Sequence, residues 1–147
     1  MSALRRSHAA SSSEVIDVSL LNLLPARIHG LGDYGSAFAL ILVGLLVAGT
    51  DLAKATGIVL GLVLLVVSLL TDYPLGVRRV IPFKLHSAGD YLGAGTLIVA
   101  PFILGFNDTD EGLTTFYIAV GLVLIAVSLV TDYEHPDRPA AIGVAEG

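Results

Sequence analysis

The feature that most constrains this chain is a series of four long apolar stretches, at about residues 33–50, 54–72, 90–106 and 112–132. A helix needs roughly 20 residues to cross about 30 Å of hydrocarbon. The first and third stretches reach that length if their helices begin near Ile28 and Leu85. The apolar residues are continuous and do not alternate as barrel strands do. The pattern therefore predicts an all-α fold, a bundle of four transmembrane helices.

The composition supports hydrocarbon surroundings. Hydrophobic residues make up 54% of the chain and charged residues 14%, with a mean hydropathy of +0.83, whereas soluble domains carry about 25% charged residues. The net charge of -5 argues against nucleic-acid binding, which needs basic surface. The absence of cysteine excludes disulfides and thiol chemistry. We expect the lipid bilayer, and not nucleic acid, to surround or bind this protein.

The second half of the chain repeats the first. Residues 28–34 (IHGLGDY) match 85–91 (LHSAGDY), and residues 67–73 (VSLLTDY) match 127–133 (VSLVTDY). The offset grows from 57 to 60 residues, so three extra residues belong to the loop near 107–111. Each copy is a helical hairpin that crosses the membrane twice. The two tandem hairpins should therefore be related by a pseudo-two-fold axis along the membrane normal.

The repeats divide the chain into six predicted segments. Ser11 and Glu14 fit a capping box, which favours a short amphipathic helix lying in the membrane interface. The segments are a disordered tail at 1–13, the interfacial helix at 14–24, hairpin repeat one at 25–73, a linker at 74–84, hairpin repeat two at 85–133, and a flexible tail at 134–147.

The distribution of positive charge predicts the orientation. Lysine and arginine concentrate on the cytoplasmic side of membrane proteins. Only Lys54 lies on the side away from the termini, and the other seven lie on the side of the termini: Arg5, Arg6, Arg27, Arg78, Arg79, Lys84 and Arg138. We therefore expect a multi-pass protein whose termini and linker at 74–84 are cytoplasmic.

Several motifs resemble a known family. They read P-x-x-x-H-x-x-x-D-Y from Pro25, S-L-x-T-D-Y-x-x-G from Ser68, and R-V-I-P-x-x-x-H-x-x-x-D from Arg79. Together they resemble the bacterial SPW-repeat membrane proteins over about residues 25–132. Residues 100–102 (APF), followed by 105–106 (GF), stand where the family has Ser-Pro-Trp and Gly-Phe. The resemblance implies a small bacterial inner-membrane protein of four helices, and it implies no activity.

The sharpest polar constellation is a histidine and an aspartate four residues apart in each copy: His29 with Asp33, and His86 with Asp90. This spacing puts both side chains on one helix face, and the pair suits proton relay or metal binding. A structural role is the favoured interpretation, with the aspartates as N-caps and the histidines as anchors. A haem held by one histidine from each copy is an alternative. With no further ligand motif, we expect no metal and no cofactor.

Asp72 and Asp132 need partners, because the helix dipole disfavours an anion at a C-terminus and carboxylates near hydrocarbon are costly. We predict a polar layer at the cytoplasmic edge in which they pair with histidine or arginine. Its candidate members are His29, Asp33, Asp72, His86, Asp90 and Asp132. A structural clamp is the favoured role, and an ion or proton path is the alternative.

The remaining candidates are structural. Four tyrosines are typical of an interface belt: Tyr34, Tyr73, Tyr91 and Tyr133. Small-xxx-small spacing favours close helix packing at two pairs, Gly57 with Gly61 and Gly89 with Gly93. Pro101 lies within the third apolar stretch and should kink its helix.

No nucleophile and base pair is recognisable, so we expect no enzyme. The sequence favours a non-enzymatic membrane protein, either an accessory or scaffolding subunit with a protein partner or a homo-oligomer. The alternative is a small module that binds protons, a metal or a redox cofactor through the His/Asp layer.

Overall fold

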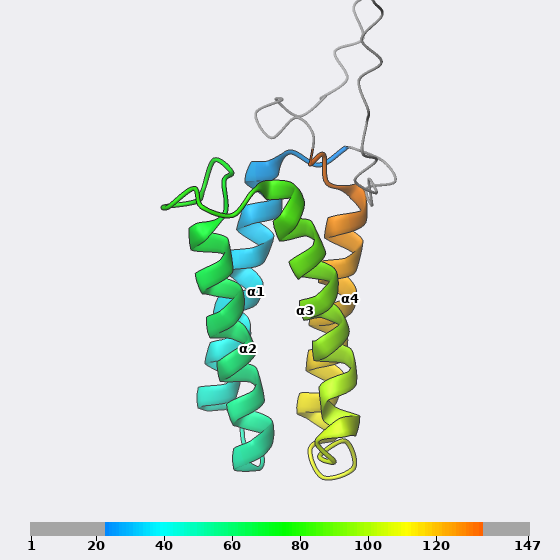
Figure 1. Cartoon of the computed structure of the whole chain (residues 1–147). Coiled ribbons are helices and arrows are strands. Elements are labelled where there is room, and N and C mark those ends of the chain that lie inside the picture. Colours follow the sequence, from blue (N-terminus) through cyan, green and yellow to red (C-terminus); the bar gives the residue numbers. More distant parts are fainter. Residues whose placement is uncertain (1–22, 134–147) are drawn as a thin grey trace, which may run out of the picture.

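The computed structural model describes residues 23–133. Within this range the chain forms four helices and no strand: α1 (Ala26–Leu46), α2 (Asp51–Leu70), α3 (Phe83–Ile103) and α4 (Glu111–Val130). Two hairpins, α1 with α2 and α3 with α4, stand side by side (Figure 1). The predicted all-α four-helix bundle is confirmed. The interfacial helix at 14–24 and the two tails fall almost wholly outside the described residues.

Proline sets the start of the first helix in each hairpin. Pro25 and Pro82 occupy the N-cap positions of α1 and α3, because proline fixes φ near −65° and cannot continue a helix in the N-terminal direction. Each helix thus begins two residues earlier than expected. Asp33 and Asp90 consequently lie seven residues inside their helices. Their interpretation as N-caps is wrong.

The second helix of each hairpin ends in the same way. The hydroxyls of Thr71 and Thr131 donate back to the carbonyls of Val67 and Val127, each at 2.7 Å. Thr71 also forms an isolated parallel bridge with Ile81, just before α3, and Thr131 forms one with Leu24, just before α1. The segment that leads into each hairpin therefore pairs with the end of the other hairpin.

Three of the described helices, α1, α2 and α4, are long and apolar enough to cross a membrane. Helix α3 matches α1 in length, 21 residues, but it is less apolar, because Gly95, Thr96 and Ala100 stand where α1 has Phe38, Ala39 and Val43. Its outward face is nevertheless apolar like the others, since large hydrophobic side chains are exposed on all four helices, including Leu46, Val63, Leu92, Ile103 and Val123. The chain is a small helical membrane protein.

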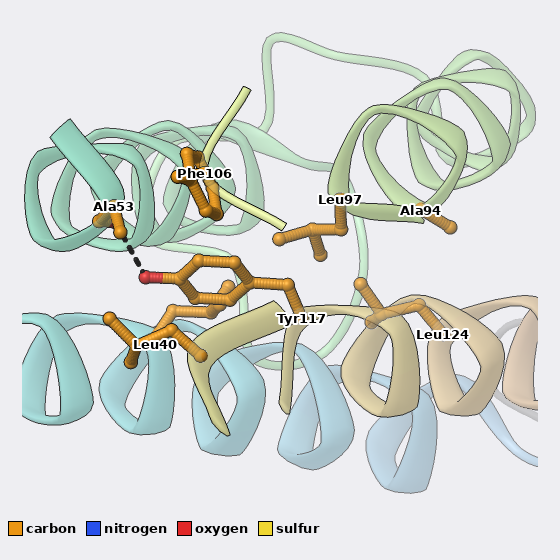
Figure 2. Packing of buried hydrophobic residues seen from close by; sticks show 8 residues of the cluster. Leu40, Ala53, Ala94, Leu97, Phe106, Tyr117 and Leu124 are labelled. Atoms are coloured by element: carbon orange, nitrogen blue, oxygen red, sulfur yellow. Dashed lines mark hydrogen bonds between the residues drawn. The ribbon is translucent and has the colours of Figure 1, made fainter. Parts of the chain in front are cut away.

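Away from the N-terminal ends of α1 and α3, the core is apolar and is centred on Tyr117. Its hydroxyl donates to the carbonyl of Ala53 on the opposite hairpin at 2.8 Å (Figure 2). A Cβ added at Gly57 would lie 2.5 Å from the Tyr117 hydroxyl oxygen, and one at Gly61 would lie 2.8 Å from the carbonyl of Ala37. Both positions on α2 therefore require glycine for close helix approach.

The second glycine pair behaves differently. A Cβ added at Gly89 or Gly93 meets nothing within 4 Å, so the expectation that this pair serves close packing is wrong. Pro101 lies in the last turn of α3, two residues before the helix ends. Its missing N–H therefore affects only the end of the helix, where Gly105 turns the chain with a φ of 73°.

Candidate metal centre

Four ionisable side chains meet near the N-terminal ends of α1 and α3, the first helix of each hairpin. His29 and Asp33 come from α1, and His86 and Asp90 come from α3. All four are at most 3% exposed. One nitrogen or oxygen of each lies within 4.8 Å of those of the other three. The repeated i, i+4 pairs thus face one another across the pseudo-two-fold axis.

The contacts within this centre are short and centre on the two Nε2 atoms. His29 Nε2 lies 3.3 Å from Asp33 Oδ2 and 3.1 Å from Asp90 Oδ2. His86 Nε2 lies 3.0 Å from Asp33 Oδ2 and 3.1 Å from Asp90 Oδ1. The two Nε2 atoms are 3.4 Å apart. Each imidazole therefore contacts both carboxylates and the other imidazole.

Two threonines fix which nitrogen of each ring carries a proton. His29 Nδ1 lies 3.0 Å from the hydroxyl of Thr131, and His86 Nδ1 lies 2.9 Å from the hydroxyl of Thr71. Each threonine already donates its single proton to a helix carbonyl, so it can only accept from the ring. Both Nδ1 atoms therefore carry hydrogen. In the neutral rings, both Nε2 lone pairs point into the centre.

That arrangement needs a positive charge at its middle. Two Nε2 lone pairs and two carboxylates would otherwise face one another as acceptors in a buried site, where unpaired polar and charged groups are costly. A proton on Nε2 or a bound cation removes the repulsion. The Nδ1–H bonds to threonine resemble the outer contacts that orient metal-ligating histidines.

The distances also fit the size of a metal site. Four ligands about 2.0–2.1 Å from a tetrahedral zinc ion lie about 3.3 Å from one another. Five separations among Nε2 of both histidines, Oδ2 of Asp33 and the two oxygens of Asp90 span 3.0 to 3.4 Å, and one ligand atom from each residue lies within 4.8 Å of the other three. A porphyrin between the histidines does not fit, because its iron needs the two nitrogens on opposite faces of the ring.

Three aromatic rings cover the centre at the end of the bundle where α1 and α3 begin. Tyr73, Phe83 and Tyr133 are buried together with Ala26. Phe83 and Tyr133 each pack edge-on to His29 with ring centroids 5.5 Å apart. Tyr73 and Tyr133 therefore do not belong to an interface belt, and that interpretation is wrong for them. Tyr34 and Tyr91 are half-buried.

The two tyrosine hydroxyls remain protonated. Burial raises the pKa of Tyr73 and of Tyr133 well above the ordinary value, and the charges of Asp33 and Asp90, respectively, raise them further. Each hydroxyl can thus act as a hydrogen-bond donor at any physiological pH.

The two aspartates have different surroundings. Asp90 Oδ2 accepts from Ser128 at 3.1 Å and from Tyr133 at 3.2 Å. At the equivalent places of repeat one, three buried atoms have no hydrogen-bond partner among the described residues: Asp33 Oδ1, Ser68 Oγ and the Tyr73 hydroxyl oxygen. Asp90 is held by two hydroxyls, and Asp33 keeps one carboxylate oxygen free.

The other predicted members of the polar layer do not join this centre. The Asp72 side chain is 55% exposed, and its nearest cation is Arg79, with Nε 3.6 Å from Oδ1. Asp132 is buried, and its backbone N–H donates to the carbonyl of Leu24. Thr71 and Thr131 close the helices just before these aspartates, which places both carboxylates beyond the helix ends. Asp72 therefore pairs with an arginine, as predicted, but it lies outside the buried centre and does not share a layer with the histidines.

Sequence reasoning missed the hydroxyl residues of the centre: Thr71, Thr131 and Ser128. A signal for them was present, because the block S-L-x-T-D-Y stands at the end of both repeats. The prediction singled out the aspartate of that block for its charge, whereas its threonine and, in repeat two, its serine contact the centre. Comparison of the chain with protein-family models, with curated proteins and with solved structures gives no match.

Proposed function

We propose that this small membrane protein binds one divalent transition-metal ion through His29, Asp33, His86 and Asp90. The observation that carries the proposal is the convergence of four buried residues whose ligand atoms lie within 4.8 Å of one another, with each histidine Nε2 3.0 to 3.3 Å from an oxygen of each aspartate. Ionisable groups at membrane depth are costly and mark functional sites by default. Asp33 is about 10 Å along the axis from the start of α1.

The donor set favours zinc. Imidazole nitrogen binds zinc and other first-row transition metals, and zinc takes four nitrogen and oxygen ligands in tetrahedral geometry. Magnesium and calcium prefer sites made only of oxygen. Two neutral imidazoles and two carboxylates would balance the charge of a divalent ion.

The ion would join the two hairpins. Helix packing is extensive within each hairpin and sparser between the hairpins. The centre takes one histidine and one aspartate from each of them, so a bound ion would bridge the pseudo-two-fold axis. It would add to the hydrogen bonds that already join the hairpins at this end, His29 with Thr131 and His86 with Thr71.

Location at the cytoplasmic edge of a bacterial inner membrane is part of the proposal. Four cations lie at the end of the bundle where α1 and α3 begin: Arg27, Arg78, Arg79 and Lys84. Positive charge favours the cytoplasmic side. The accessory or scaffolding role stays a prediction, since no contact among the described residues bears on a protein partner.

Metal analysis of the purified chain tests the proposal. We expect full-length protein in mild detergent, stripped with a chelator and reloaded, to retain one zinc ion per chain. Cobalt in its place should give the intense visible absorption of tetrahedral coordination. His86→Gln and Asp33→Asn each remove one ligand and should weaken zinc binding by more than about 100-fold, beyond the effect of an outer contact.

Asp72→Asn is the matched control, since it removes a carboxylate outside the centre. It should bind zinc like the unaltered chain. Circular dichroism checks that each variant keeps its helices. Failure of the unaltered chain to hold zinc or cobalt after reloading would leave protons as the occupants of the centre and would overturn the metal proposal. Equal zinc binding by His86→Gln would do so as well.

A further inference from the structure

A crevice opens between the two hairpins beside the metal centre. Its volume is about 280 Å³, close to the roughly 300 Å³ at which small-molecule pockets begin. Leu60, Leu64 and Val67 of α2 form one wall, and Asp90, Gly93 and Leu97 of α3 lie on the other. The crevice is thus an apolar slot whose lining includes Asp90, a member of the centre.

Glycine keeps this slot open. Gly89 and Gly93 both line it, and a Cβ at either position would meet nothing within 4 Å. On α4 of the same hairpin, by contrast, a Cβ at Gly121 would lie 2.8 Å from the carbonyl of Ala94. The small residues on α3 therefore make space for something other than a neighbouring helix.

The polar residues that line the crevice can accept a hydrogen bond from a ligand. Besides Asp90, the lining includes one hydroxyl, that of Thr96, which already donates to the carbonyl of Leu92 at 2.8 Å. Asp90 Oδ2 accepts from two hydroxyls, while Oδ1 faces His86. Because a carboxylate oxygen has two lone pairs, Oδ1 can accept a further hydrogen bond.

We propose that this crevice binds a lipid-soluble molecule with an apolar tail and a hydroxylated head, such as an alkylphenol, whose hydroxyl donates to Asp90. The walls are leucine and valine of helices that face hydrocarbon, so the ligand enters from the bilayer. An acyl chain of a phospholipid has no donor to offer to the carboxylate. The site needs Asp90 and the crevice and does not require an ion in the centre.

A matched pair of probes separates the hydrogen bond from simple filling of the crevice. We expect native mass spectrometry of the full chain in detergent to show an adduct with 4-nonylphenol. The adduct with nonylbenzene, which lacks the hydroxyl, should be about tenfold weaker, because one hydrogen bond to a charged acceptor is lost.

Gly93→Leu should abolish the 4-nonylphenol adduct by filling the crevice. Gly35→Leu is the control, since a Cβ there also meets nothing within 4 Å and the position on α1 is outside the crevice. Both variants should keep the zinc content of the unaltered chain, so loss of zinc binding and loss of phenol binding are read separately. Equal adducts with both probes, or an undiminished phenol adduct in Gly93→Leu, would overturn the proposal.

Discussion

The two hairpin repeats carry the same motif, yet they hold their aspartates differently. In repeat two, Ser128 and Tyr133 both donate to Asp90. In repeat one, the equivalent serine and tyrosine make no such bonds, and Asp33 Oδ1 has no partner. Identical side chains at matching positions therefore give one carboxylate that accepts from two hydroxyls and one that accepts from neither. A site built from a duplicated motif need not be symmetric at the level of its hydrogen bonds.

The opposite half of the bundle is asymmetric as well. Tyr117 of α4 stands at the position that Gly57 occupies in α2, 60 residues earlier. The tyrosine fills the space left by that glycine and donates to Ala53 on the other hairpin (Figure 2). A large residue in one repeat and a small one in the other thus interlock across the pseudo-two-fold axis, which prevents the hairpins from packing as exact copies.

The largest effect should come from breaking that interlock. Tyr117→Ala should lower the free energy of unfolding by about 3–5 kcal/mol, as for other large buried aromatics replaced by alanine. Gly57→Ala should also destabilise the chain, because its Cβ meets the Tyr117 hydroxyl at 2.5 Å. In the Tyr117→Ala background that clash is absent, so the two effects should not add. Circular dichroism during unfolding in mixed detergent gives the free energy of unfolding of the unaltered chain, the two single variants and the double variant. Additive effects would show that the two residues do not interlock.

A smaller effect should separate the two aspartates. Tyr133→Phe removes a hydroxyl that donates to Asp90 and should weaken zinc binding by about 10–100-fold, as loss of an outer contact does. Tyr73→Phe removes a hydroxyl that makes no hydrogen bond to Asp33 and should leave zinc affinity nearly unchanged. Competition with a chromogenic chelator gives both affinities. Equal weakening in the two variants would show that the repeats are equivalent in solution.

Much of the architecture could be predicted from the sequence. Continuous apolar stretches and two matching halves are strong local signals, and they gave the four helices and the hairpin repeats. Hydropathy alone was less decisive for α3, since Gly95, Thr96 and Ala100 make it less apolar than α1.

The centre itself could be predicted only in part. Spacing placed His29 with Asp33 and His86 with Asp90 on common faces, but it could not show that the two faces meet. The helix starts decided this: Pro25 and Pro82 begin the helices early and move the aspartates away from the ends, into the bundle. The role of Gly89 and Gly93 depended on the distance between α2 and α3, which a glycine pattern does not contain.

The smallest effect concerns the loops at the other end, where the equivalent residues Thr50 and Asp110 bind each other. Thr50 caps its own helix by accepting from the backbone N–H of Ala53. Asp110, at the N-cap of α4, makes no such bond and instead accepts from Thr50, from its backbone N–H at 3.0 Å and from its hydroxyl at 2.6 Å. The hydrogen bond from the Thr50 hydroxyl is the main cause that lowers the pKa of Asp110.

This contact should make a small part of the stability depend on pH. A carboxyl whose pKa is lower in the folded state stabilises the fold above its unfolded pKa of about 3.9 and loses that contribution as pH falls through the folded value. Asp110→Asn should therefore melt below the unaltered chain at pH 6, and the gap should close below about pH 4. Asp108→Asn, which changes an exposed carboxylate nearby, should show no gap at pH 6. If the melting temperature of Asp110→Asn is still lower by the same amount at pH 3, the contribution of the Thr50 contact does not depend on the charge of Asp110.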